Sequence, residues 1–202
     1  MVHIKIFVDL SLLAAEETTM AEAAVNKMSY NIRKAVKKDC KAIYKFLSDM
    51  VEYEQVQDSF TQTYEDVERE GFGENPMFHG LVVECQQGSA EEKSVVGCCL
   101  YYPSYSTLGG RLMYLEIIYV DSAHRGSKLA STLIRQLSKI AMEDNCREIK
   151  FVVLPWNKHA YDVYKYMGAD DEAIKWRSMA WHYDALQKMS LISPPGNVNI
   201  DL

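Results

Sequence analysis

Disulfide and zinc-binding signatures are missing from this sequence. It has five cysteines, an odd number, and none of them forms a CxxC pair. We therefore expect neither a disulfide framework nor a zinc site, but reduced thiols in a cytoplasmic protein. Cys98 and Cys99 are neighbours in an expected strand, so they should point to opposite faces and act as small buried apolar residues.

Targeting and membrane-spanning segments are missing as well. No apolar run is long enough to cross a bilayer, and the apolar stretch at residues 4–13 is interrupted by Asp9. No basic segment precedes it as in a secretory signal, and Glu16 and Glu17 argue against a transit peptide. We expect residues 1–28 to be a poorly ordered extension or an alternative start, residues 29–190 to form one domain, and residues 191–202 to be a flexible tail.

Positive charge is in short supply. The chain has 22 Lys and Arg against 28 Asp and Glu, which gives a net charge of −6. Such a balance disfavours nucleic acid and anionic membranes as partners. It would suit a cationic substrate, and it is equally explained by plain solubility.

Hydrophobic periodicity predicts an α+β domain with a mixed central sheet. Three strands in an antiparallel meander are followed by a β-α-β unit, and helices flank the sheet. Thr63 and Asp66 are typical of a helix start, and Gly71 and Gly73 are expected to end that helix. The expected strands are residues 30–33, 79–85, 95–102, 111–120, 148–154 and 174–181, with a turn at 103–110, and the expected helices begin near 38, 63, 129, 158 and 183.

One strand-turn-helix segment, residues 114–131, contains the residues best suited to chemistry. An apolar strand runs into a polar turn that opens a long helix, and amides at a helix start can bind phosphate. Arg125 adds a cation, and Gly126 permits close approach of the backbone. On composition alone this is a generic pattern, since most helix starts hold no ligand.

The same segment resembles the pyrophosphate-binding motif of the GNAT superfamily, R/Q-x-x-G-x-G/A. Arg125 matches its first position and Ala130 its last, while Lys128 stands where the central glycine is expected. The lysine either crowds the pyrophosphate or binds it through its ammonium group. Other segments, in the same order and at suitable spacing, resemble the diamine (spermidine/spermine) and thialysine N-acetyltransferases: residues 71–76, 101–102, 114–116, 156–157, 164–165, 168–169 and 176–177.

The resemblance implies a GNAT fold and an N-acetyltransferase that uses acetyl-CoA as co-substrate, without a metal, in a homodimer. Glu116 would be the general base and Tyr164 the general acid. Asn157 and the backbone groups of Ile118 and Val120 would bind the cofactor. The turn that would hold the pyrophosphate consists of Arg125, Gly126, Ser127, Lys128, Leu129, Ala130 and Ser131. Without the resemblance, the sequence favours a salt-bridged or edge-facing role for Glu116 and a packed helix aromatic for Tyr164.

Substrate recognition is predicted less fully. In the polyamine enzymes an Asp follows the catalytic Glu, and the preceding loop carries another Asp and a Trp, whereas this chain has Ile117 and a loop without either residue. Glu52, Glu54 and Glu116 are the acidic candidates for binding the amine, although Glu52 and Glu54 also fit a solvated helix face. A thialysine-like amino acid, a diamine or an arylalkylamine fits better than spermine or spermidine. Two alternatives stay open: a catalytically weak binding or scaffold protein, and an acetyltransferase that acts on proteins.

Overall fold

The computed structural model describes residues 28–87 and 93–192. These residues fall into two compact units, one that extends to Ala169 and one that begins at Asp170. The predicted extension at residues 1–28 lies outside the described residues except for Met28, and so does most of the predicted tail. The single-domain boundaries therefore stay a prediction.

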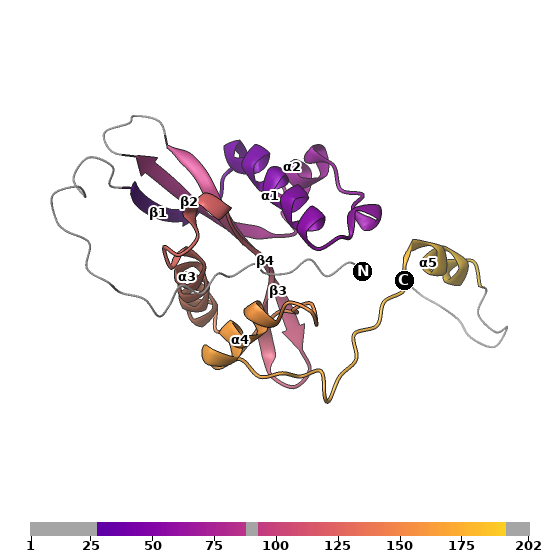
Figure 1. Ribbon diagram of the computed structural model, residues 1–202. Coiled ribbons are helices and arrows are strands. Elements are labelled where there is room, and N and C mark those ends of the chain that lie inside the picture. The colour runs from indigo at the N-terminus through magenta and orange to yellow at the C-terminus, as the bar shows by residue number, and fades with distance from the viewer. Residues whose placement is uncertain (1–27, 88–92, 193–202) are drawn as a thin grey trace. The chain divides into compact units, whose positions relative to one another are not determined.

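The first unit is built on a five-stranded sheet with the order β1-β2-β3-β4-β5 (Figure 1). Four strands form an antiparallel meander: β1 Met28–Lys34, β2 His79–Gln87, β3 Ser94–Ser106 and β4 Gly110–Val120. The short β5, Ile149–Lys150, pairs parallel to β4. This mixed sheet confirms the predicted α+β class.

Helices cover both faces of the sheet. On one face lie α1, Cys40–Tyr53, and α2, Tyr64–Phe72; on the other lie α3, Leu129–Glu143, and α4, Lys158–Tyr166 (Figure 1). Short 3-10 turns at residues 37–39, 57–59 and 122–124 join these elements. The fold thus has three layers with a separate apolar core on each side of the sheet.

The buried positions follow the predicted periodicity closely. All six α1 residues expected on its apolar face are buried: Cys40, Ile43, Phe46, Leu47, Met50 and Val51. In α3, Ile134 and Ile140 are only partly buried and complete the rim of the core instead. Cys98 and Cys99 belong to opposite cores, which confirms that they point to opposite faces, and all five cysteines are free and buried.

One predicted boundary is wrong by several residues, and another is close to the observed one. The turn expected at 103–110 is much shorter, because β3 continues to Ser106. Pro103 is tolerated in this strand because β2 begins opposite Tyr101, so the proline has a neighbouring strand on only one side. Gly71 lies inside α2, and Gly73 alone caps its end. The predicted capping box of Thr63 and Asp66 is confirmed, with the Asp66 amide donating to Thr63 Oγ1 at 3.1 Å.

Two predicted strands near the C-terminus are also corrected. The strand expected at 148–154 is reduced to Ile149–Lys150. The strand expected at 174–181 is not formed within residues 170–192, where only α5, Tyr183–Ser190, has regular structure. Ile174 and Met179 there are 92% and 88% exposed. An apolar, alternating stretch becomes a strand only when a sheet edge pairs with it, and residues 170–192 supply none.

Candidate active site

The turn after β4 is held by one internal hydrogen bond and by two polar contacts with the sheet. Asp121 Oδ1 accepts a hydrogen bond from the Ala123 amide at 3.1 Å. His124 Nδ1 lies 3.2 Å from the Tyr30 hydroxyl of β1. Arg125 Nε donates to the carbonyl of Val120 at 3.3 Å, so the predicted pyrophosphate-binding cation is held against the end of β4. The predicted binding turn therefore has a fixed attachment at its start.

Left-handed backbone brings the chain from this turn into α3. Gly126 has φ of 81°, and Lys128, the N-cap of α3, has φ of 58° and ψ of 18°. The position where the family motif has glycine thus adopts the conformation that glycine favours, and here a lysine bears the strain, about 1–2 kcal/mol for an L-residue. The Lys128 side chain is exposed. The departure from the motif changes the side chain and leaves the turn geometry in place.

The start of α3 leaves main-chain amides without intrahelical acceptors beside this turn. The Lys128 carbonyl accepts the Thr132 amide at 3.0 Å and the hydroxyls of Ser131 and Thr132 at 2.9 and 2.8 Å. Amides in the first turn of a helix have no intrahelical acceptor and carry the positive end of the helix dipole. Because the side chains of Leu129, Ala130 and Ser131 are buried, only their amides are suited to hold an anion.

A β-bulge positions Glu116. In the pairing of β3 with β4, the consecutive residues Leu100 and Tyr101 lie opposite Ile117 and Leu115, so Glu116 is an additional residue in β4. The bulge also reverses the alternation of side chains. Met113 and Leu115 face the core under α3 and α4, and after the bulge Ile118 and Val120 face that same core. Bulges commonly re-aim side chains beside active sites.

Two tyrosines flank Glu116, and the sequence predicted no role for either. The rings of Tyr102 and Tyr114 stack with centroids 5.1 Å apart. Burial and then the Glu116 charge raise the pKa of Tyr102, and the same causes raise the pKa of Tyr114 to about 12. The Glu116 carboxylate therefore lies beside this tyrosine pair, on the α1/α2 side of the sheet. The sequence did offer one signal, because Tyr114 and Glu116 are two residues apart in a strand, a spacing that usually places side chains on the same face.

Tyr164 reaches the sheet from the opposite side. It is 5% exposed in the core under α3 and α4, and its ring lies 4.7 Å from the ring of Phe151. Its hydroxyl is buried and has no hydrogen-bond partner among the described residues. Burial, with a smaller contribution from Cys99, raises the pKa of Tyr164 well above its ordinary value. This phenol is therefore protonated at neutral pH.

Glu116 and Tyr164 thus approach from opposite faces, and the sheet is open between β4 and β5. These strands pair only at Met113 with Ile149 and at Tyr114 with Lys150. Beyond Tyr114, no other described strand pairs with β4 on that side. The open side of β4 includes Glu116, Ile118 and Val120. This unpaired stretch of β4 leads directly into the turn and the start of α3.

The remaining predicted residues are distributed unevenly. Asn157 is buried and caps α4, with its Oδ1 accepting the Ala160 amide at 3.2 Å, so its first role is structural. Glu54, at the C-cap of α1, is 5% exposed, whereas Glu52 faces solvent. The adjacent ring of Tyr53 lies 5.5 Å from that of Trp156 and so joins the end of α1 to the segment before α4. Glu54, unlike Glu52, is therefore a buried acidic group at the end of α1.

Comparison with known proteins identifies the fold and the family of this chain. A family model described as the Acetyltransferase (GNAT) family matches residues 41–169. Among solved structures, an integron cassette protein from V. cholerae has a TM-score of 0.63 at 21% identity, covering 82% of this chain and all of that one. A ribosomal-protein-alanine N-acetyltransferase from Brucella melitensis has a TM-score of 0.57 at 17% identity, covering 77% and 99%. These likenesses establish the fold.

The class defined by this family is that of acetyl-CoA-dependent N-acetyltransferases. Thialysine N-epsilon-acetyltransferases of Bos taurus and Sus scrofa are 37% and 38% identical over 163 residues, which are 79% of this chain and 96% of each relative. The spermidine/spermine N(1)-acetyltransferase-like protein 1 of Homo sapiens is 30% identical over 81% of this chain and 23% of its own length. The chain belongs to the GNAT family, in the group that contains the thialysine acetyltransferases.

Among the described helices, none is both long and apolar enough to cross a bilayer. The predicted cytoplasmic location stays a prediction.

Proposed function

We propose that this protein transfers the acetyl group of acetyl-CoA directly to the primary amine of a small molecule, with Glu116 as general base and Tyr164 as general acid. The observation that carries the proposal is the buried Tyr164 hydroxyl, which has no hydrogen-bond partner among the described residues. A buried polar group of this kind is costly and calls for an explanation, such as a bound ligand. Acetyl-CoA supplies an acetyl group already activated as a thioester.

The proposed reaction assigns one proton transfer to each residue. An alkylammonium group has a pKa near 10, so the amine must lose a proton before it can attack. The Glu116 carboxylate accepts that proton, directly or through water. A bond forms between the amine nitrogen and the acetyl carbon as the bond from that carbon to sulfur breaks. The Tyr164 hydroxyl then gives its proton to the departing sulfur.

The turn and the start of α3 would hold the pyrophosphate. Amides from Gly126 to Ser131, the Arg125 guanidinium and the exposed Lys128 ammonium offer donors and positive charge in one place. The left-handed backbone at Lys128 supports this fit, because the path of the turn is the one glycine would take. Backbone groups of Ile118 and Val120 would hold the pantetheine arm, and the amide of Asn157 would assist.

The proposed substrate carries the amine that is acetylated and few other positively charged groups. Glu116 supplies a negative charge beside the stacked rings of Tyr102 and Tyr114, which are suited to an alkylammonium group. Ile117 follows Glu116 where the polyamine enzymes have an acid, and Glu54 is a second, buried acidic group. We favour a thialysine-like amino acid, a diamine or an arylalkylamine over spermine. The names of the bovine and porcine relatives support the first of these.

An acetylation assay with an amine panel tests the proposal. The purified protein, acetyl-CoA and each amine are mixed, and release of free thiol is followed. We expect turnover with small amines and much less with peptides that offer an N-terminus or a lysine. Turnover with peptides alone would indicate a protein-directed enzyme. Acetyl-CoA binding by calorimetry without turnover would indicate a scaffold protein instead.

A further inference from the structure

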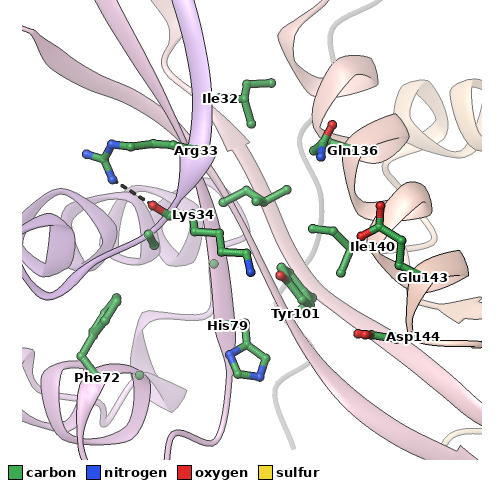
Figure 2. A pocket seen from close by; sticks show the side chains of 14 residues that line it. Ile32, Arg33, Lys34, Phe72, His79, Tyr101, Gln136, Ile140, Glu143 and Asp144 are labelled. Atoms are coloured by element: carbon green, nitrogen blue, oxygen red, sulfur yellow. Dashed lines mark hydrogen bonds between the residues drawn. The ribbon is translucent and has the colours of Figure 1, made fainter.

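A cavity of about 480 Å³ lies at the opposite end of α3 from the proposed cofactor turn. It is enclosed by the end of β1, the start of β2, the end of α2 and the C-terminal half of α3 (Figure 2). None of the residues that line it belongs to the proposed catalytic or cofactor site. Its volume is in the range of sites for small molecules.

The helix side of this cavity is strongly negative. Glu143 is the last residue of α3 and Asp144 is its C-cap, so two carboxylates stand at the negative end of the helix dipole. Such a placement is unfavourable unless a cation compensates it. Arg111 donates to the main-chain oxygen of Asp144 at 3.4 Å. Within residues 28–87 and 93–192, neither carboxylate takes part in a salt bridge.

A buried phenol points into the same cavity. Tyr101 is 4% exposed, and Figure 2 shows its hydroxyl directed toward the open space. In the part of the chain that the structure describes, this hydroxyl makes no hydrogen bond. Burial first, then Cys99 and Asp144, raise the pKa of Tyr101 to about 12, so the phenol keeps its proton at neutral pH. It can donate to an anion or accept from a cation.

The sheet side of the cavity is basic. Lys34, the last residue of β1, extends its ammonium group toward the cavity, and His79, the first residue of β2, lies close by with its ring centroid 5.8 Å from that of Tyr101 (Figure 2). Lys34 forms no ion pair with any residue of the described ranges. Arg33, whose side chain is engaged by Asp39 and Glu84, contributes no free charge.

We propose that this cavity is a binding site for a free α-amino acid, separate from the acetylation site. The ammonium group of the ligand would lie between Glu143, Asp144 and the Tyr101 hydroxyl, and its carboxylate would meet Lys34 and His79. Opposite charges on opposite walls match a zwitterion better than a simple amine or a simple acid, because each of those would leave one wall uncompensated. The site would let an amino acid bind without being acetylated.

Calorimetric titration of the full-length protein with three matched probes tests the charge requirement. The probes are L-leucine, isoamylamine, which lacks its carboxylate, and 4-methylpentanoate, which lacks its ammonium group. We expect leucine to bind at least tenfold more tightly than either, since each charge-assisted contact is worth roughly a factor of ten or more. An absence of leucine binding at about 10 mM, or equal binding of isoamylamine, would overturn the proposal.

Variants locate the binding. Asp144→Asn and Lys34→Met are each expected to raise the Kd for leucine by roughly tenfold, and Tyr101→Phe, which keeps the buried ring, by a few-fold. Glu116→Gln serves as the control for the proposed acetylation site and should leave the Kd unchanged. Loss of leucine binding in Glu116→Gln but not in Asp144→Asn would place the ligand at the acetylation site and refute the second site. Because no turnover is measured, this result is independent of the proposed function.

Discussion

At the scale of single residues, the hydroxyl of Tyr164 is the most informative atom of the molecule. It is buried without a hydrogen-bond partner in the described residues, so the fold gains nothing from its polarity. An active-site group can be kept in such a position for its chemistry at a cost in stability. A variant that lacks only this hydroxyl can therefore distinguish a catalytic role from a structural one.

Replacement of Tyr164 by Phe should therefore lower turnover without lowering the stability of the fold. Turnover is expected to fall by roughly 10²–10⁴, the usual cost of losing a general acid. The free energy of unfolding, from urea denaturation, should stay the same or rise, because a buried unsatisfied hydroxyl is removed. Tyr166→Phe is the matched control, since that ring is 80% exposed on the same helix. Nearly unchanged turnover in Tyr164→Phe would exclude the acid role.

Replacement of Glu116 by Gln should change the pH dependence of the reaction. The variant must rely on amine that is already deprotonated, so its deficit in kcat/KM should be greatest near neutral pH and shrink toward the amine pKa of about 10. Glu65→Gln, at an exposed position in α2, is the control. A deficit that is the same at every pH, or no deficit, would contradict the role of Glu116 as base.

Replacement of Lys128 by Gly relieves the left-handed strain at the start of α3. We expect a gain of about 0.5–1 kcal/mol in the free energy of unfolding, since the greater chain entropy of glycine offsets part of the relief. Lys128→Ala removes the same charge but keeps the strain, so it should show no gain. Acetyl-CoA affinity should fall similarly in both variants if the ammonium binds phosphate. Equal stability of the two variants would refute the strain.

Residue chemistry was predictable from the sequence wherever a single position carried it. Thr63 and Asp66 predicted the start of α2. Lys128 was recognisable as a departure from the glycine of the family motif. The bulge at Glu116 was not predictable, because an inserted residue shows itself only in the pairing of two strands. For the same reason the neighbouring pair of Tyr102 and Tyr114, distant in sequence, had no visible role.

At the scale of elements, one arginine connects the first strand to its neighbours. Arg33 of β1 binds Asp39 at 2.6 and 2.9 Å with two guanidinium nitrogens and Glu84 of β2 at 2.9 Å with its Nε. Burial opposes the charge on Asp39, but the bonds from Arg33 and from the Val36 amide outweigh it and lower the pKa of Asp39. The contact fixes the turn that leads into α1.

Asp39→Asn should remove a pH-dependent part of the stability. A carboxyl group whose pKa is lowered on folding stabilises the fold above its unfolded pKa, about 3.9, and loses that contribution as the pH falls through its folded pKa. The wild type should therefore be more stable than the variant by about 2 kcal/mol at pH 7, and the difference should disappear in acid. Asp58→Asn is the surface control. Urea denaturation at several pH values measures the stability difference between wild type and variant. A difference that does not change with pH would contradict the link to the ionisation of Asp39.

Elements whose signals lie within their own sequence were predictable, whereas elements that depend on pairing with another strand were not. Helices α1, α3 and α4 follow from apolar spacing and end signals within their own sequences. The turn at 103–110 was predicted too long because proline and glycine usually form turns. Pro103 can lie within β3 because β2 does not extend alongside it, and strand pairing of this kind is not visible in the sequence. The strand expected at 174–181 has the right pattern, but a strand requires an edge to pair with.

At the scale of the whole molecule, the second unit carries large apolar side chains on its surface. Trp176 and Trp181 are 62% and 68% exposed. Exposed apolar groups gathered in one segment commonly mark an interface. We propose that this segment pairs with a second copy of the chain in a homodimer, as the family resemblance implied.

Light scattering after size exclusion tests the dimer. We expect the wild type to elute as a dimer and the double variant Trp176→Ser, Trp181→Ser to shift toward a monomer, because the apolar surface that pairs the copies is reduced. Leu108→Ser, at a position that is 87% exposed in the turn between β3 and β4, is the control. A monomeric wild type would refute the proposal.

The bulge in β4 makes Glu116 an insertion that neither core requires. If Glu116 were deleted, Leu115 would be followed directly by Ile117, and plain alternation would keep Ile118 and Val120 in the core beneath α3. Ile117 and Tyr119 would likewise stay in the core beneath α1. The extra length of β4 therefore belongs to the carboxylate alone, and a lineage that discarded this residue could retain both cores intact.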